Sequence, residues 1–142
     1  MKAEQIFSIA NLIAMLSWII LAVAPRWIVT RKVILSGAIP LLLSVAYLCL
    51  IILFFGKSEG SFNSLAGVMQ LFTNEWTVLA GWIHYLAFDL FVGTWEVKDA
   101  QEKNISHWFV IPCLFLTFML GPIGFLLYCV LRFFLAKEVK ND

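Results

Sequence analysis

The chain has 142 residues, of which 62% are hydrophobic and 13% are charged, whereas a soluble domain is about 45–50% apolar and about 25% charged. Lipid is therefore the expected surroundings for most of its surface, and an ordinary soluble domain is excluded. The formal net charge of +1 leaves no basic face for nucleic acid, so no nucleic-acid partner is expected.

Two apolar spans are predicted in the first part of the chain, at about residues 5–24 and 33–55. The first ends before Pro25, because proline cannot continue a helix. It lacks a cleavage motif and an Arg- and Ser-rich leader, so neither a signal peptide nor a transit peptide is expected. Within it, the amide of Asn11 either bonds a neighbouring helix or contacts a ligand. The second span carries a stripe of small and polar residues that favours close helix packing.

Residues 56–72 interrupt this apolar pattern. GKSEGS is turn-forming, and the apolar run from Leu65 to Phe72 is too short to cross a bilayer. We expect an interfacial or re-entrant segment here, which either covers the mouth of a cavity in the bundle or serves as a surface anchor.

The third span, at about residues 74–96, is framed by Trp76 and Trp95, nineteen residues apart. On a helix this spacing is about 28 Å, close to the roughly 30 Å of hydrocarbon between the two boundaries where Trp collects. Asn74 is placed to cap this helix, and Glu75 to stabilise its first turn.

Two ionisable residues lie inside this frame, His84 near the middle and Asp89 about 9 Å from the Trp95 boundary by helical rise. Such groups are costly in lipid and indicate function. The Asp89 carboxyl is expected to be protonated, paired or hydrated, either as a structural partner or as an acid/base, and imidazole can donate and accept near neutral pH. The two residues lie about 140° apart on a helical wheel. Either the helix is polar on two faces, or it is distorted near Gly81.

The fourth span is predicted at about residues 108–131, after a short charged loop that begins at Glu96. Its GPIG sequence indicates a kink whose freed carbonyls face protein or water. Glu75 and Glu96 are interpreted as interfacial, and His107 as an interfacial or capping residue. The predicted fold is all-α: one domain, residues 1–142, forming an integral membrane bundle of four transmembrane helices. Lys and Arg residues divide five against five between its two sides, so the orientation is undecided.

Cofactor chemistry has little support in the sequence. The three cysteines, Cys49, Cys113 and Cys129, lie in apolar runs without CxxC spacing and indicate buried thiols. The His and acidic residues are too scattered for a metal site, and neither a glycine-rich nucleotide motif nor a serine-hydrolase elbow is present. We expect no metal and no cofactor, which leaves proton transfer on an apolar substrate as the enzyme hypothesis.

The run AGWIHYLAFDLF at residues 80–91, followed by HWFVIPC and GPIG, resembles the abscisic-acid-deficient-4-like family, which includes the plant neoxanthin synthases. The resemblance covers nearly the whole chain and points to the bacterial branch. It implies a small four-helix membrane protein, and its plant members open an epoxide of violaxanthin to an allenic alcohol without net redox change. The family signatures fall on Trp82-Ile83-His84, Asp89-Leu90-Phe91 and Thr73-Asn74-Glu75.

The leading hypothesis is a cofactor-independent isomerase of a carotenoid or other isoprenoid lipid, multi-pass in a bacterial cytoplasmic membrane, with membrane lipid as a partner and a homo-oligomer left open. The candidate catalytic residues are His84, Asp89 and Glu75, and the candidate substrate-binding residues are Asn11, Asn74, Trp82, Tyr85 and Tyr128. A non-catalytic carotenoid- or lipid-binding assembly subunit explains the same polar stripes. A small four-span transporter is the third class, although such exporters usually carry a carboxylate in the first span, where this chain has only Asn11.

Overall fold

The computed structural model describes residues 2–54, 56 and 59–136, and every regular element in these residues is helical, which confirms the all-α prediction. In chain order the elements are α1 (Ala3–Val23), the short π-helix η1 (Thr30–Ile34), α2 (Ala38–Phe54), α3 (Leu65–Leu71), α4 (Glu75–Glu102), α5 (His107–Leu120) and α6 (Pro122–Leu135).

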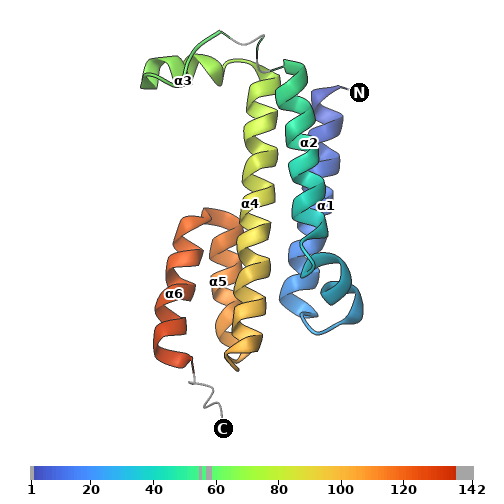
Figure 1. The fold of residues 1–142 in the computed structure, drawn as a ribbon, viewed down its shortest axis with the longest axis vertical. Helices are drawn as coiled ribbons and strands as arrows, with labels where there is room; N and C mark the ends of the chain where they lie inside the picture. Colours follow the sequence, from blue (N-terminus) through green and yellow to red (C-terminus); the bar gives the residue numbers. More distant parts are fainter. Residues whose placement is uncertain (1, 55, 57–58, 137–142) are drawn as a thin grey trace.

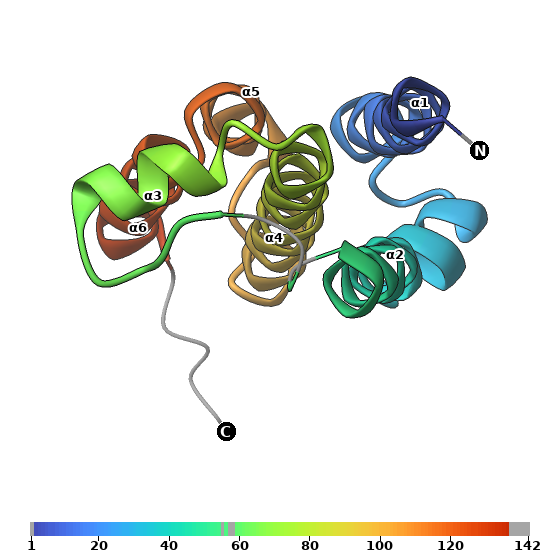
Figure 2. The same cartoon turned by 90° about the horizontal axis from the view of Figure 1, so that it is seen from above.

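Three stretches are long and apolar enough to cross a membrane: Ala3–Val23, Thr30–Phe54 and Glu75–Glu102. They correspond to the first three predicted spans. α4 is the central element, because it packs against α1, α2, α5 and α6 (Figures 1 and 2). Its 28 residues correspond to a length of about 42 Å, which exceeds the roughly 30 Å hydrocarbon core of a bilayer.

α4 starts where the sequence predicts and ends later. The side chain of Asn74 accepts hydrogen bonds from the backbone N–H groups of Trp76 and Thr77 at 2.9 and 3.3 Å, which confirms the predicted cap. The predicted loop beginning at Glu96 is wrong, since the helix continues to Glu102. The residues after Glu96 contain neither glycine nor proline and are mostly good helix formers.

The fourth predicted span is wrong as a single membrane-crossing helix. Gly121 ends α5 and begins α6 at φ 45° and ψ −94°, a conformation open to glycine, and Pro122 then starts α6. The predicted kink at GPIG is therefore a full reversal, and α5 and α6 pack against each other as a hairpin (Figure 1). Each helix has 14 residues, about 21 Å.

Contacts between elements define the two ends of the bundle. At one end, the ring Nε2 of His107 lies 2.8 Å from the carbonyl oxygen of Ala22, and the Gln101 amide donates to the carbonyl of Pro25 at 3.4 Å. The α1–α2 connection, the end of α4 and both ends of the hairpin thus meet there, and we call this the hairpin-base end. At the opposite end, the α3 end, Phe54 stacks on Trp76 with ring centroids 4.1 Å apart.

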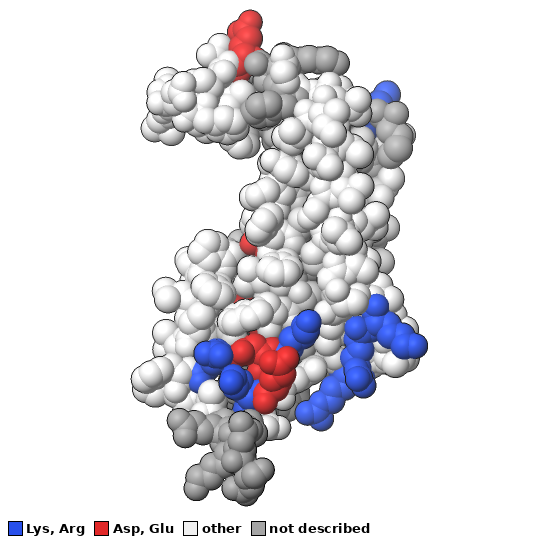
Figure 3. All heavy atoms as spheres, in the orientation of Figure 1, with Lys and Arg blue, Asp and Glu red and all other residues white. Residues whose placement is uncertain are grey.

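α3 lies across the α3 end of the bundle rather than along it (Figures 1 and 2). Ser64 caps it by accepting from the N–H of Gly67. The ring of Phe72, just after α3, packs over Gly81 of α4, where an added Cβ would lie 3.1 Å from the ring. Between α3 and the tip of the hairpin the surface is hollowed (Figure 3), and we call this region the hollow.

Candidate functional site on helix α4

Asp89 lies at the midpoint of α4, fourteen residues after Glu75 and thirteen before Glu102. The hairpin tip packs directly against its carboxyl group, since a Cβ added to Gly121 would lie 2.9 Å from Oδ1. The side chain is half-buried, and its Oδ2 atom is buried without a hydrogen-bond partner. Glycine at position 121 therefore provides both the reversal of the chain and the close approach of Asp89.

Tyr85, one helical turn before Asp89, ties α4 to the hairpin tip. Its hydroxyl donates to the backbone carbonyl of Phe118 at 2.7 Å. In a continuous helix this carbonyl would accept from the N–H four residues later, but that residue is Pro122, which has no N–H. Tyr85 supplies the missing donor, and the tyrosine is thereby fixed one turn from the acid.

A line of polar and aromatic side chains extends from Tyr85 to α1. The indole N–H of Trp82 donates to the side-chain oxygen of Asn11 at 3.1 Å, and the rings of Trp82 and Tyr85 are 5.4 Å apart. Asn11 therefore forms a hydrogen bond to a neighbouring helix, which is one of the two roles that the sequence suggests for it. Three of the predicted substrate-binding residues thus form one contiguous cluster that ends beside Asp89.

Glu96 is fully buried, with 0% of its side chain exposed, so the prediction that it is interfacial is wrong. The Thr117 hydroxyl of α5 donates to its Oε1 atom at 2.9 Å, whereas Oε2 is buried without a partner. Gly124 of α6 allows this packing, because an added Cβ there would overlap Thr117. The burial arises because α4 continues past Trp95 and the hairpin covers this side of it.

Asp99 completes a row of acids along α4, facing the hairpin. It accepts hydrogen bonds from the Tyr128 hydroxyl at 2.7 Å and from the Arg132 Nε at 2.6 Å. Tyr128, a predicted substrate-binding residue, is 1% exposed and is engaged with Asp99 at the hairpin base instead of lying at the tip. The small and polar residues of α5 and α6 are therefore the ones that pack against the acids of α4, namely Thr117, Gly121, Gly124 and Tyr128.

His84 lies on a different face of α4, as the helical wheel predicts, and it is exposed. Its ring is 5.5 Å from that of Tyr47 on α2 and 4.7 Å from that of Phe88. α4 is continuous through Gly81. The helix is therefore not distorted there, which was one of the two possibilities raised by the sequence, and His84 and Asp89 do not pair. Below His84, towards the hairpin base, an apolar groove of about 440 Å³ lies between α2 and α4. It is lined by Gly37, Pro40, Leu41, Ser44, Ala87, Phe88 and Phe91.

The remaining candidates, Asn74 and Glu75, lie at the α3 end. Glu75 is exposed and lines a groove of about 320 Å³ between α1 and α4, together with Glu4, Phe7 and Trp82. By helical rise it is about 21 Å from Asp89. Among the described residues, no three His, Cys, Asp or Glu side chains are grouped so that they could hold a metal ion.

The chain is a helical membrane protein, because three of its helical stretches are long and apolar enough to cross a membrane. The central one, α4, carries acids that face a hairpin. Residues 5–128 match the model of the ABA DEFICIENT 4-like family, and the chain belongs to this family, which confirms the resemblance of AGWIHYLAFDLF. It is 24% identical, over an alignment 149 positions long, to "Protein ABA DEFICIENT 4, chloroplastic" of Arabidopsis thaliana. That alignment covers 99% of this chain and 64% of the relative, so the chain spans less than two thirds of that protein's length. No solved structure matches the chain.

Proposed function

We propose that the protein is a cofactor-independent isomerase that uses acid/base chemistry on a carotenoid or another isoprenoid lipid, at a site formed by Asp89 and Tyr85. The observation that carries this proposal is the placement of Asp89. Its carboxyl group lies at the midpoint of a membrane-length helix, half-buried, with one oxygen unpartnered. An ionisable group at such depth is expensive and marks a functional site by default.

The hollow beside Asp89 suits a long apolar substrate. The residues around the hairpin tip are apolar and exposed, including Met119, Leu120 and Ile123. On the α4 side, the exposed ring of Trp82 lies next to Tyr85, and aromatic surfaces can stack along a polyene. A lipid-soluble substrate would reach this hollow through the bilayer itself, so a water-filled entry is not required.

One carboxyl group can carry out an epoxide opening without net redox change. The protonated Asp89 gives its proton to the epoxide oxygen as the C–O bond breaks, and the resulting carboxylate removes a carbon-bound proton nearby as the new double bond forms. The proton count is unchanged, and the carboxyl returns to its starting state. Because the acid and base steps can share Asp89, the separation of His84 from it does not exclude this chemistry.

A non-catalytic carotenoid- or lipid-binding role is the second candidate. The observation that favours it is the apolar groove between α2 and α4, which can hold a lipid chain without any acid or base. In this case the protein would present or store an isoprenoid for another enzyme, and His84 with its aromatic neighbours would lie at the groove's upper end.

Mass spectrometry of pigments and lipids from host membranes distinguishes these functions. A host that accumulates epoxidised carotenoids would carry the wild-type protein, the Asp89→Asn variant or no protein. We expect a new product of unchanged mass with the wild type alone, at matched amounts of protein in the membrane. Pigment that copurifies with the wild type and remains chemically unaltered in every sample would instead establish the binding role.

A further inference from the structure

We infer that the hairpin-base end faces the cytoplasm, against anionic lipid headgroups, and that the Asp89 site opens to the opposite leaflet. The first part follows from the fold and the charges alone. The second part rests on the proposed function, since it names the leaflet from which the isoprenoid substrate arrives.

The hairpin reaches only halfway along α4. Its tip packs on Asp89, the midpoint of α4, and its last turn is held to Asp99 by Arg132. Each arm is about 21 Å long, shorter than the roughly 30 Å hydrocarbon core. The segment predicted as a fourth crossing therefore enters and leaves the bilayer on one side, with its backbone shielded by α4 as membrane-embedded irregular backbone requires.

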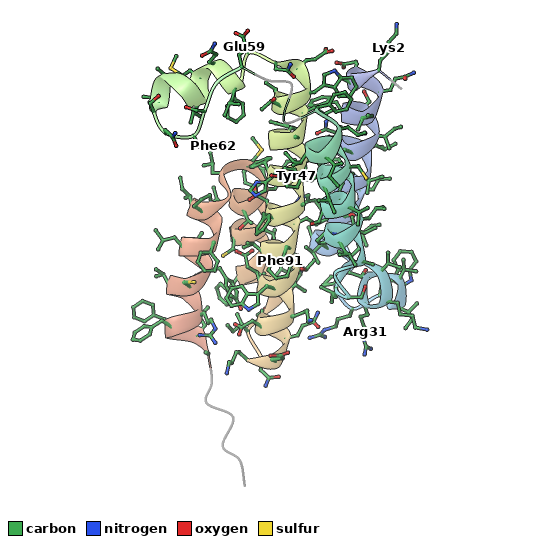
Figure 4. The ribbon with its side chains drawn as sticks, turned by 45° about the horizontal axis from the view of Figure 1, so that its top comes forward. Lys2, Arg31, Tyr47, Glu59, Phe62 and Phe91 are labelled. Carbon is green, nitrogen blue, oxygen red and sulfur yellow. The ribbon has the colours of Figure 1, made fainter. Side chains whose placement is uncertain are left out.

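With a single crossing, the Lys and Arg residues divide equally between the two sides of the membrane. The reversal at Gly121 removes this balance, because it brings the end of α6 to the side of the α1–α2 connection. Among the described residues, six basic side chains lie at the hairpin-base end and one, Lys2, at the α3 end (Figures 3 and 4). The six are Arg26, Arg31, Lys32, Lys98, Lys103 and Arg132. The equal division also included Lys57, Lys137 and Lys140, which lie outside the described residues.

The described acidic residues are found at both ends. Glu4, Glu59 and Glu75 lie at the α3 end, where Figure 4 shows Glu59 and Lys2, with Arg31 at the far end. Glu96, Asp99 and Glu102 lie in the hairpin-base half of α4, but acidic residues contribute little to the orientation of membrane helices. Lys and Arg in short loops near helix ends are retained on the cytoplasmic side, and the anionic lipids of that leaflet attract basic side chains next to the membrane. The hairpin-base end has the composition of a cytoplasmic surface.

As a consequence, α4 is covered by the hairpin in one half of the bilayer and left accessible in the other half. The hairpin fills the cytoplasmic half beside α4 and covers Glu96 and Asp99. The hollow lies in the other half, between the hairpin tip and α3 (Figure 3). A substrate would therefore approach Asp89 along the outer leaflet, and α3 would lie at the surface of that leaflet.

Single-cysteine labelling tests the orientation and the hairpin together. In a variant with Cys49, Cys113 and Cys129 replaced by serine, one cysteine is introduced at Asn63, Glu102 or Ala136. Spheroplasts of a bacterial host are treated with a membrane-impermeant maleimide before or after lysis. We expect Asn63→Cys to be labelled before lysis, and Glu102→Cys and Ala136→Cys only after it.

Three other results would overturn the inference. Labelling of Ala136→Cys on the same side as Asn63→Cys, with Glu102→Cys on the other side, would mean that the hairpin crosses the membrane. Labelling of Glu102→Cys and Ala136→Cys before lysis, with Asn63→Cys protected, would mean that the orientation is reversed. Labelling of all three before lysis would mean that the protein inserts in two orientations.

A green fluorescent protein fused to the C-terminus of the natural chain should fluoresce, and an alkaline phosphatase fusion should be inactive, whether or not the serine variant folds. These readouts do not depend on turnover, so an active Asp89→Asn variant would contradict the proposed function alone.

Discussion

Two faces of α4 each carry an ionisable residue at nearly the same depth, but the packing around the two side chains differs. Asp89 lies under the hairpin tip, with Gly121 against its carboxyl and Tyr85 one turn away. His84, five residues earlier, is exposed beside the rings of Tyr47 and Phe88. Depth in the membrane is therefore not sufficient to define a site. The element folded against the residue decides whether it has a confined, polar environment.

The largest expected effect is that of Asp89→Asn, which keeps the shape of the side chain and removes its acid/base capacity. We expect product formation to fall by at least about 100-fold, since general acid–base catalysis typically contributes about 10²–10⁴-fold. The measurement is product per unit of membrane-inserted protein by mass spectrometry. Turnover at the wild-type level would remove Asp89 from the reaction.

Gly121→Ala should have the next largest effect, a loss of about 10-fold or more in product, because the added Cβ meets the Asp89 carboxyl at 2.9 Å. Gly37→Ala is a matched control. Gly37 also has a positive φ, 84°, but an added Cβ there meets nothing within 4 Å. Both variants place an L side chain at a positive φ, at a backbone cost of about 1–3 kcal/mol that is greater at Gly121 because its ψ of −94° lies outside the left-handed helical region, and only Gly121→Ala should lose activity. Equal losses in the two would assign the effect to strain.

Thr117→Val removes the hydroxyl that bonds Glu96 and leaves both carboxyl oxygens without a donor. We expect the free energy of unfolding in detergent to fall by about 0.5–2 kcal/mol, the range found for hydrogen bonds between membrane helices. Thr94→Val is the control, since the Thr94 hydroxyl is buried but bonds only the Phe91 carbonyl of its own helix. A larger loss in Thr94→Val would show that Glu96 does not depend on Thr117.

His84→Gln should have the smallest effect, with product formation within about 2-fold of the wild type. The reason is its place on a separate, exposed face of α4. The same pigment assay measures it, at matched protein levels. A loss comparable to that of Asp89→Asn would mean that the groove between α2 and α4 takes part in the reaction.

Much of the fold could be predicted from local chemistry. The Asn74 cap and the angular separation of His84 from Asp89 depend on residue spacing within one helix, and the structure agrees with both. The family could also be identified from the sequence around Trp82 and Asp89, and the family model confirms it.

The reversal at Gly121 could not be predicted in the same way. An apolar run of this length with two prolines has the hydropathy of a kinked span, and only the backbone angles at one glycine distinguish a kink from a turn. Glu96 was misplaced for a related reason. A charged stretch after Trp95 resembles a loop, and the burial of Glu96 comes from the hairpin, a contact distant in sequence. The clue available in the sequence was that Glu96 shares a helical face with Asp89.

Photo-crosslinking determines directly which face of α4 holds the ligand. Membranes containing the protein would be illuminated with a diazirine-bearing isoprenoid alcohol, and the modified residues mapped by mass spectrometry of peptides. We expect adducts around the hollow, at Trp82 and Tyr85 of α4 and residues 118–123 of the hairpin tip, reduced by an excess of unlabelled isoprenoid. Adducts confined to residues 40–44 of α2, on the His84 face, would contradict the placement of the substrate beside Asp89.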